Sequence, residues 1–377
     1  MSGIYIHIPY CKQACYYCNF HFSISTKNKA KVVEAMLKEL YIKSQNYNDI
    51  VETIYFGGGT PSFLETEEIN CLTEAVFNNF KTASNLEITL EANPDDLTIK
   101  KLKELSKSKI NRLSIGVQSF NDHDLKIMNR AHNSKDANRC VKNAKKYFDN
   151  LSIDLIYGMP ESTLESWEHN LDIAVSYNTN HISSYALTIE PKTALEKYVE
   201  KGLVKLLDEE IVFKQYKLML RRLSNENYIN YELSSFAKDG YFSKNNTAYW
   251  LRKNYIGIGP SAHSFDGISR SWNISNNNLY LKAIEENKMY YKTEKLTKTD
   301  QYNEYVMTGL RTIWGISLDF LKDNFGTKYQ NHFVEKSKKY IYSKHLILKN
   351  NVIKTTIEGK FLADGIASEL FIVKLNI

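Results

Sequence analysis

The sequence has little of what would assign it to a specialised class of protein. It contains five cysteines in 377 residues, and its formal charge of +6 is modest. No apolar run approaches the roughly 18 residues that suggest a membrane-spanning helix. The N-terminus leads into an apolar strand pattern and shows no cleavable signal. We therefore expect a cytoplasmic protein without a transmembrane segment, for which peripheral contact with a membrane stays open.

Two further classes of protein are disfavoured by features that the sequence lacks. Basic residues are spread along the chain in short clusters only, such as 142–146 and 336–339. Such clusters are typical of solvated helix faces, so we expect no nucleic-acid partner. The glycine-rich stretch 57–62 lacks the Gly-Lys-Ser/Thr ending of a P-loop, which argues against a nucleoside triphosphatase.

The cysteines that are present are concentrated near the N-terminus. Cys11, Cys15 and Cys18 form a C-x3-C-x2-C pattern in one short loop. Three thiolates at this spacing can hold three irons of a cubane [4Fe–4S] cluster, which ordinarily takes four cysteine ligands. The remaining iron would be open to a small molecule, and the amino acid end of S-adenosylmethionine (SAM) can chelate it. We therefore predict that these cysteines bind a [4Fe–4S] cluster.

The cysteines have possible uses other than binding a cluster. A zinc site would need four ligands, and only His7 and His21 are near enough in the sequence to supply the fourth. A structural disulfide is disfavoured because no secretory leader is visible. Cys71 and Cys140 fall in segments with helical periodicity, and we expect both to be buried as small apolar residues.

The chain alternates between strand-like and helix-like segments over its first half. Strands are expected at 3–9, 52–56, 86–92, 112–118, 151–157 and 181–189, separated by segments of helix length. This order predicts βαβ units, a parallel sheet and an open, partial (β/α)6 barrel. The barrel is expected to cover residues 1–240 and a smaller α+β domain residues 241–377. Within these, we expect one long helix over 193–223 and a short strand over 370–373.

Polar residues are placed where these strands end. Glu91 ends the third strand, Gln118 ends the fourth, Asp154 lies on the fifth, and Arg130 follows the helix after Gln118. In parallel (β/α) folds such positions meet at one rim, beside the cysteine loop. Taken singly, each is often only a helix cap. Together with the glycines of 57–59, which allow close approach of the backbone, they can bind the ribose hydroxyls and the amino acid end of SAM.

Six stretches, in order along the chain, resemble the HemN/HemW branch of the radical SAM superfamily. They are 3–9 (GIYIHIP), 57–61 (GGGTP), 90–94 (LEANP), 114–120 (SIGVQSF), 129–132 (NRAH) and 154–160 (DLIYGMP). The resemblance implies a cluster on the three cysteines. It also implies SAM contacts from Tyr5, Tyr17, Gly58, Gly59, Thr60, Glu91, Gln118, Arg130, Asp154 and Ala186.

Two departures separate the subfamilies of that branch. The oxygen-independent coproporphyrinogen III oxidases carry an extra cysteine two residues after the triplet, where this chain has Phe20. They also have a longer N-terminal arm, whereas the cysteine loop here begins at residue 11. The chain therefore resembles the HemW type, which implies a chaperone that binds heme and transfers it to acceptor proteins. An electron donor such as a flavodoxin or ferredoxin is also implied; an oxidase-like radical SAM enzyme is the alternative.

A third departure concerns heme. HemW proteins usually have His-Asn-x-x-Tyr-Trp in their later half, and this chain has Asn245 at the histidine position. An amide is not among the usual ligands of heme iron, whereas histidine and tyrosine are. Tyr249 or His263 is therefore the expected heme ligand. The competing interpretations are packing between domains for Tyr249 and a hydrogen-bonded loop histidine for His263.

Overall fold

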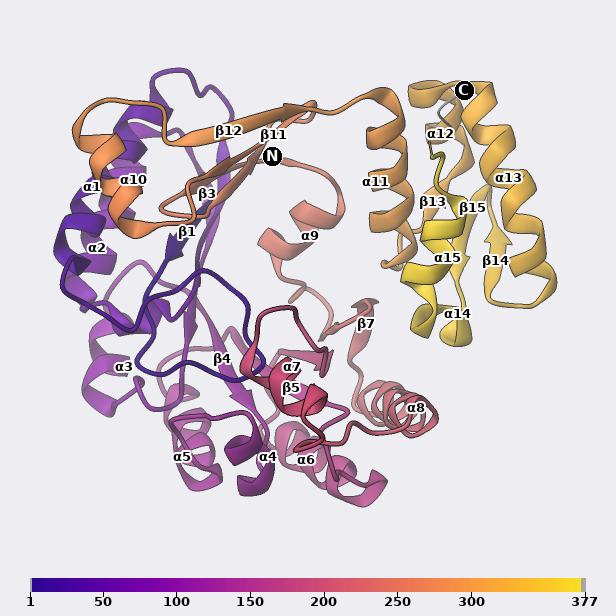
Figure 1. Ribbon diagram of the computed structural model, residues 1–377, viewed down its shortest axis with the longest axis horizontal. Helices are drawn as coiled ribbons and strands as arrows, with labels where there is room; N and C mark the ends of the chain where they lie inside the picture. Colours follow the sequence, from indigo (N-terminus) through magenta and orange to yellow (C-terminus); the bar gives the residue numbers. More distant parts are fainter. Residues whose placement is uncertain (1, 374–377) are drawn as a thin grey trace.

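A single large sheet organises most of the chain. The computed structural model describes residues 2–373, and its twelve-stranded sheet has the order β12-β11-β10-β9-β1-β2-β3-β4-β5-β6-β8-β7. The first six strands are parallel neighbours: β1 (Ser2–Ile8), β2 (Val51–Gly58), β3 (Thr82–Ala92), β4 (Arg112–Gln118), β5 (Leu151–Tyr157) and β6 (His181–Ala186). The two ends of the described sheet, β12 and β7, do not pair, so the expected open, partial barrel is confirmed (Figure 1).

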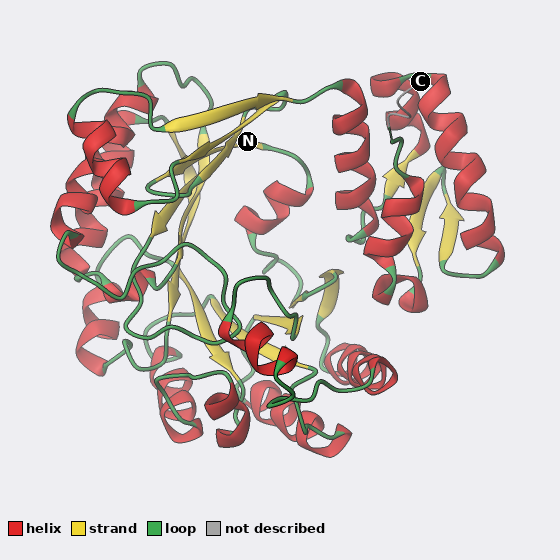
Figure 2. Cartoon of the chain, viewed as in Figure 1, coloured by secondary structure: helices red, strands yellow, loops and turns green. Residues whose placement is uncertain are grey.

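Helices cover the outer side of the parallel strands (Figure 2). They are α1 (Lys29–Ser44), α2 (Thr66–Asn79), α3 (Ile99–Leu105), α4 (Asp122–Ile127), α5 (Ser134–Ala144) and α6 (Leu164–Ser176), with the 3-10 turn η1 (Pro61–Phe63) after β2. Successive side chains of a strand point to opposite faces. Ile4 and Ile6 therefore pack in the core with Met36 of α1, whereas Tyr5 and His7 point to the inner face of the sheet.

The expected long helix over 193–223 is wrong. The structure has two helices there, α7 (Ala194–Glu200) and α8 (Glu209–Asn225). The break follows from Gly202, whose φ of +67° lies in the left-handed region and cannot continue a right-handed helix. The two following strands, β7 (Ile229–Glu232) and β8 (Ser235–Ala237), extend the sheet beyond β6 in antiparallel sense.

The segment from 241 to 295 extends the other edge of the sheet. It contains α9 (Lys244–Trp250), β9 (Asn254–Ile258), β10 (His263–Phe265), β11 (Ser269–Asn273), α10 (Asn277–Glu285) and β12 (Tyr291–Lys295). Strand β9 pairs in parallel with β1, and the next three strands continue outward. The boundary expected between residues 240 and 241 stays a prediction.

A separate hydrophobic core forms near the C-terminus. It is built by α11 (Lys298–Leu310), α12 (Leu318–Phe325), α13 (Thr327–Tyr342) and α15 (Ala363–Leu370) around a small sheet of β13 (Ile316–Ser317), β14 (Leu346–Lys349) and β15 (Val352–Thr355). The short helix α14 (Ile357–Phe361) lies between β15 and α15, and its Phe361 packs on the core of the large sheet. The strand expected over 370–373 is wrong. Leu370, Phe371 and Ile372 are apolar because they pack on this core at the end of α15, not because they pair in a sheet.

The buried carboxylate of Glu39 connects α1 to the segment that extends the sheet. It is fully buried and forms an ion pair with Lys43 at 2.9 Å. It also accepts hydrogen bonds from the backbone N–H of Gly259 at 2.7 Å, from Asn273 at 2.8 Å and from the Tyr280 hydroxyl at 2.6 Å. A buried charge is tolerated when it is paired and hydrogen-bonded in this way.

We predict that Glu39→Ala lowers the free energy of unfolding by about 3–5 kcal/mol, because it leaves the Lys43 ammonium and the buried donors without an acceptor. Denaturant unfolding of the cofactor-free protein measures this. Glu34→Ala, on the exposed side of the same helix, is the matched control and should change stability by less than about 0.5 kcal/mol. Equal effects of the two substitutions would contradict the role given to Glu39.

Candidate functional site

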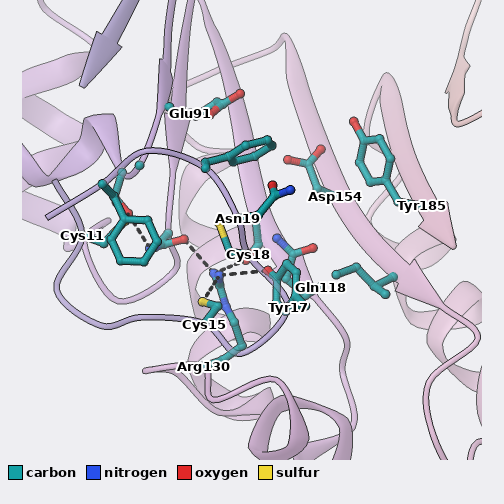
Figure 3. Close-up of a pocket in the computed structure, with 18 of the residues that line it drawn as sticks. Cys11, Cys15, Tyr17, Cys18, Asn19, Glu91, Gln118, Arg130, Asp154 and Tyr185 are labelled. Carbon is teal, nitrogen blue, oxygen red and sulfur yellow. Dashed lines mark hydrogen bonds between the residues drawn. The ribbon is translucent and has the colours of Figure 1, made fainter. Parts of the chain in front are cut away.

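The carboxyl ends of the parallel strands surround a cavity of about 580 Å³ (Figure 3). Most of the residues expected to bind cofactors line it: Cys11, Cys15, Tyr17, Cys18, Gly58, Gly59, Thr60, Glu91, Gln118, Arg130, Asp154 and Ala186. Tyr5 does not line it. Its ring lies on the inner face of β1, 6.1 Å from the ring of Tyr55, and Tyr55 donates a hydrogen bond to Glu91 at 2.7 Å. Tyr5 therefore supports a residue of the cavity wall.

The cysteine loop is fastened to the segment that follows α4. Asn129 has a φ of +55°, a conformation that asparagine tolerates better than most residues. Its side-chain amide donates to the carbonyl of Ala14 at 2.8 Å, and its own carbonyl accepts from the Gln13 amide at 2.8 Å. The backbone N–H of Tyr16 adds a bond to the carbonyl of Met128 at 3.1 Å. These contacts hold the loop over the strand ends.

The thiols of the loop are free and half-buried, and those of Cys11 and Cys15 accept hydrogen bonds. The Thr60 hydroxyl donates to Sγ of Cys11 at 3.4 Å, and Nη1 of Arg130 donates to Sγ of Cys15 at 3.3 Å. A Cβ at Gly59 would lie 2.7 Å from the Tyr10 carbonyl oxygen and 3.0 Å from Sγ of Cys11, so only glycine allows this close approach. Burial raises the pKa of the Cys11 thiol to about 11, so a bound metal would have to displace its proton.

The arrangement of the thiols suits a cluster better than a single ion. Within residues 2–373, no three His, Cys, Asp or Glu side chains converge as the ligands of one metal ion. A cubane cluster instead takes one thiolate on each iron, and the three half-buried thiols at one end of the cavity fit that donor set.

The guanidinium of Arg130 connects the loop to the strand ends. Its Nη2 donates to Oδ1 of Asn93 at 2.6 Å and to the carbonyl of Gly116 at 2.8 Å, while Nη1 reaches Cys15 and the Tyr17 hydroxyl (Figure 3). Its buried Nε has no acceptor among the described residues. A cation held here attracts an anionic group into the cavity.

Polar side chains from three strands line the same cavity as this cation. Asp154 accepts from the Ser114 hydroxyl at 3.1 Å and from the Ser152 hydroxyl at 3.3 Å, and burial raises its pKa. Burial also raises the pKa of Glu91 to about 7. Gln118 ends β4 with a φ of +67°, a strained conformation of the kind that clusters at ligand sites. The site therefore offers hydrogen-bond acceptors and an amide in the same cavity as a fixed positive charge.

Sequence reasoning missed several residues of this cavity. Asn93, which holds Arg130, and Ser114, which holds Asp154, both line it, as do Asn19, Tyr185 and Glu190. Asn93 lies two residues after Glu91 at the same strand end, and this position in the sequence indicates a place at the site. Tyr185 carried no such signal, because an aromatic residue near the end of β6 is equally typical of core packing.

The expected heme ligands lie elsewhere. Neither Tyr249 nor His263 is among the described residues of this cavity. The ring of Tyr249, on α9, makes a T-shaped contact with Tyr255 at 4.6 Å, and His263, on β10, is exposed and stacks on Trp272 at 6.2 Å. Asn245 is buried against β2, where it accepts from the Thr53 hydroxyl at 3.0 Å.

The two cysteines outside the triplet differ in their burial. Cys140 is buried on α5, as expected. The expectation that Cys71 is buried is wrong, because its position on α2 faces solvent while Leu72 of the next position enters the core. Phe20 lines the mouth of the cavity with 67% of its side chain exposed.

Comparisons with known proteins agree with this organisation. Residues 5–174 match the model of the Radical SAM superfamily, and residues 296–362 match that of the HemN C-terminal domain. The chain is 33% identical to heme chaperone HemW of Bacillus subtilis over 97% of this chain and 98% of the relative. It is 31% identical to heme chaperone HemW of Lactococcus lactis over 100% of this chain and 98% of the relative.

A solved structure shows the same fold. Coproporphyrinogen III oxidase (HemN) from Escherichia coli, described as a radical SAM enzyme, superposes with a TM-score of 0.84 over 98% of this chain and 90% of that chain. The two sequences are 20% identical, so the likeness concerns the fold.

The raised pKa of Glu91 gives a test of its burial. Between about pH 4.3, where a glutamate of the unfolded chain titrates, and about pH 7, the folded state keeps a proton that the unfolded state has lost. The free energy of unfolding therefore falls as pH rises through this window. We predict that Glu91→Gln has nearly the stability of the original protein below this window and exceeds it by up to about 3 kcal/mol at pH 8.

Urea unfolding of the cofactor-free protein at pH 4.5 and pH 8 measures this difference. The exposed Glu74, on α2, supplies the control: Glu74→Gln should leave the pH dependence unchanged. A Glu91→Gln variant whose stability changes with pH in the same way as the original protein would show that Glu91 titrates normally in the folded state.

Proposed function

The chain belongs to the HemW family of the radical SAM superfamily, and from this premise we propose that it binds a [4Fe–4S] cluster, SAM and heme, and transfers heme to acceptor proteins. The observation that carries the cofactor part is the convergence of the cysteine triplet and the strand-end residues on one cavity. The heme part rests on two relatives named heme chaperone, each matched over nearly its whole length.

In this proposal the cysteine loop holds the cluster. Cys11, Cys15 and Cys18 would each bind one iron, and the cluster would supply an electron to a ligand on the open iron. The loop's fastening to Asn129 keeps the three thiolates at one end of the cavity. Arg130 donates a hydrogen bond to Sγ of Cys15 and contributes positive charge beside it. The protein thus supplies position and electrostatics.

The remaining cavity is the proposed SAM site. Glu91, Gln118 and Asp154 offer acceptors and an amide for the ribose hydroxyls and the ammonium group of SAM, and Gly58 and Gly59 let the backbone approach it. Tyr17, Thr60, Arg130 and Ala186 complete the proposed contacts. Because Tyr5 does not line the cavity, its proposed part is indirect, through the Tyr55–Glu91 hydrogen bond.

Two observations support a chaperone over an oxidase. Phe20 stands where coproporphyrinogen III oxidases carry an extra cysteine, and its exposed ring lies at the mouth of the cavity. Radical chemistry on a substrate requires a site closed to water and to side reactions. An open mouth bordered by an exposed aromatic ring suits loading and release of a ligand better.

Partners follow from the same proposal. They are heme, heme-acceptor proteins and an electron donor such as a flavodoxin or ferredoxin, with the cytoplasm as the proposed location and peripheral contact with a membrane left open. None of the helices within residues 2–373 combines the length and apolar character needed to span a bilayer. Tyr249 and His263 stay predicted heme ligands.

The experiment that tests the proposal uses the full chain, reconstituted anaerobically with iron and sulfide. We predict a Soret band on addition of hemin, transfer of that heme to an apo heme protein, and no protoporphyrinogen from coproporphyrinogen III in the presence of SAM and a reductant. A coproporphyrinogen III oxidase assayed in parallel is the control. Formation of protoporphyrinogen would establish the oxidase alternative, whereas absence of hemin binding would remove the chaperone function.

A further inference from the structure

A second cavity, of about 530 Å³, is lined by residues at the end of α9 and by residues of the C-terminal core. It shares no described lining residue with the cavity at the strand ends. Its volume falls in the range of about 300–1,000 Å³ that is usual for small-molecule sites. Five aromatic rings from α9, α11, α12 and the loop before β13 line it: Trp250, Tyr305, Trp314, Phe320 and Phe325. Such a wall suits a flat, largely apolar ring system.

The charges at this cavity favour an anionic group on that ring system. Arg252 and Lys253 line it, and no carboxylate is among its described lining residues. The nearest acidic partner is Glu304, which accepts from Arg270 at 2.7 Å and lies 3.8 Å from Nη2 of Arg252. Glu304 is thus committed mainly to Arg270, and the guanidinium of Arg252 retains capacity for a carboxylate.

Arg252 has a backbone conformation that residues other than glycine rarely adopt. Helix α9 ends in a Schellman motif, in which Lys253 N–H bonds the Ala248 carbonyl at 2.9 Å and Arg252 N–H bonds the Tyr249 carbonyl at 3.0 Å. Arg252 has a φ of +55° at the place where glycine is usual. Its Nε is buried and has no acceptor among the described residues. A strained backbone and an unpaired buried donor on one residue indicate a ligand contact.

Tyr305 supplies the other element of the site. Of the described residues that line the cavity, it alone has a side chain of a type that binds heme iron, since histidine, cysteine and methionine are missing from that set. Its hydroxyl accepts from the backbone N–H of Ser317 at 3.0 Å, and its ring stacks on Phe320 at 4.5 Å. The oxygen is thereby held in place on the wall formed by α11.

We propose that this cavity binds a planar tetrapyrrole with carboxylate side chains, such as heme, with Arg252 on a carboxylate and Tyr305 on the iron. This inference rests on the proposed function, that the chain binds heme, and adds where it binds. Coordination of ferric iron by Tyr305 would release the phenol proton to solvent, with no change of oxidation state. Helix α9 would then connect this cavity to the large sheet, because Asn245 at its start packs on β2 and Trp250 at its end lines the cavity.

The test is a hemin titration of the full chain, followed by its Soret absorption, with Arg252→Gly as the first variant. Glycine suits the backbone of residue 252, so thermal unfolding should occur at the same temperature or higher. Hemin affinity should nevertheless fall about tenfold or more, the loss expected for a hydrogen bond to a charged group. Arg139→Ala, at an exposed position of α5, is the matched control and should bind like the original protein.

The second variant, Tyr305→Phe, separates binding of iron from binding of the ring. It should remove the tyrosinate-to-iron charge-transfer absorption of the hemin complex and leave the affinity for metal-free protoporphyrin within about threefold, because the apolar wall is retained. Tyr342→Phe, at an exposed position of α13, is the control and should leave the spectrum unchanged.

The outcomes separate this inference from the proposed function. If the original protein binds no hemin, both the heme site proposed at this cavity and the proposed chaperone function fail. If it binds hemin and neither Arg252→Gly nor Tyr305→Phe differs from its control, the cavity is not the heme site, although the chaperone function stands. Loss of the hemin spectrum in Tyr249→Phe or His263→Ala, with Tyr305→Phe unchanged, would likewise overturn the cavity and establish the ligand expected from the sequence.

Discussion

Parallel pairing of β1 to β6 is the constraint on which the site depends. Because all six strands run in the same direction, their carboxyl ends meet at one edge, and the loops after them must share that edge. The cysteine loop after β1, the glycines after β2, Glu91 on β3, Gln118 on β4 and Asp154 on β5 reach one cavity for this reason. Residues separated by more than a hundred positions in the chain thereby line one cavity.

This arrangement places charged groups inside the protein. Glu91, Asp154 and Arg130 are all held within the protein, where each loses the hydration that a charged group favours. The structure compensates locally: Tyr55 donates to Glu91, serines donate to Asp154, and Asn93 and a backbone carbonyl accept from Arg130. Groups fixed in this way need little reorganisation when a charged ligand enters. Two residues with a positive φ, Gln118 and Arg252, lie on the walls of the two cavities.

The sequence predicted the parts of the molecule that local patterns determine. The six parallel strands follow from apolar alternation, and most of the first cavity follows from polar residues at strand ends. Other features depend on distant packing. The apolar residues 370–372 resemble a strand but cover the C-terminal core, and Cys71 differs from Cys140 only by the helix face on which it lies. The second cavity was not predicted, because its walls come from α9, α11 and α12, whose proximity no local pattern reveals.

The central claim is that the cysteine triplet and the strand-end cavity bind a cluster and SAM together. Electron paramagnetic resonance of the anaerobically reconstituted, reduced protein, recorded before and after addition of SAM, tests it most directly. We predict a signal from a reduced [4Fe–4S] cluster that changes when SAM is added, in the original protein and in Cys140→Ser, and loss of that signal in Cys15→Ser. A spectrum that saturating SAM leaves unchanged, or a full cluster signal in Cys15→Ser, would contradict the claim.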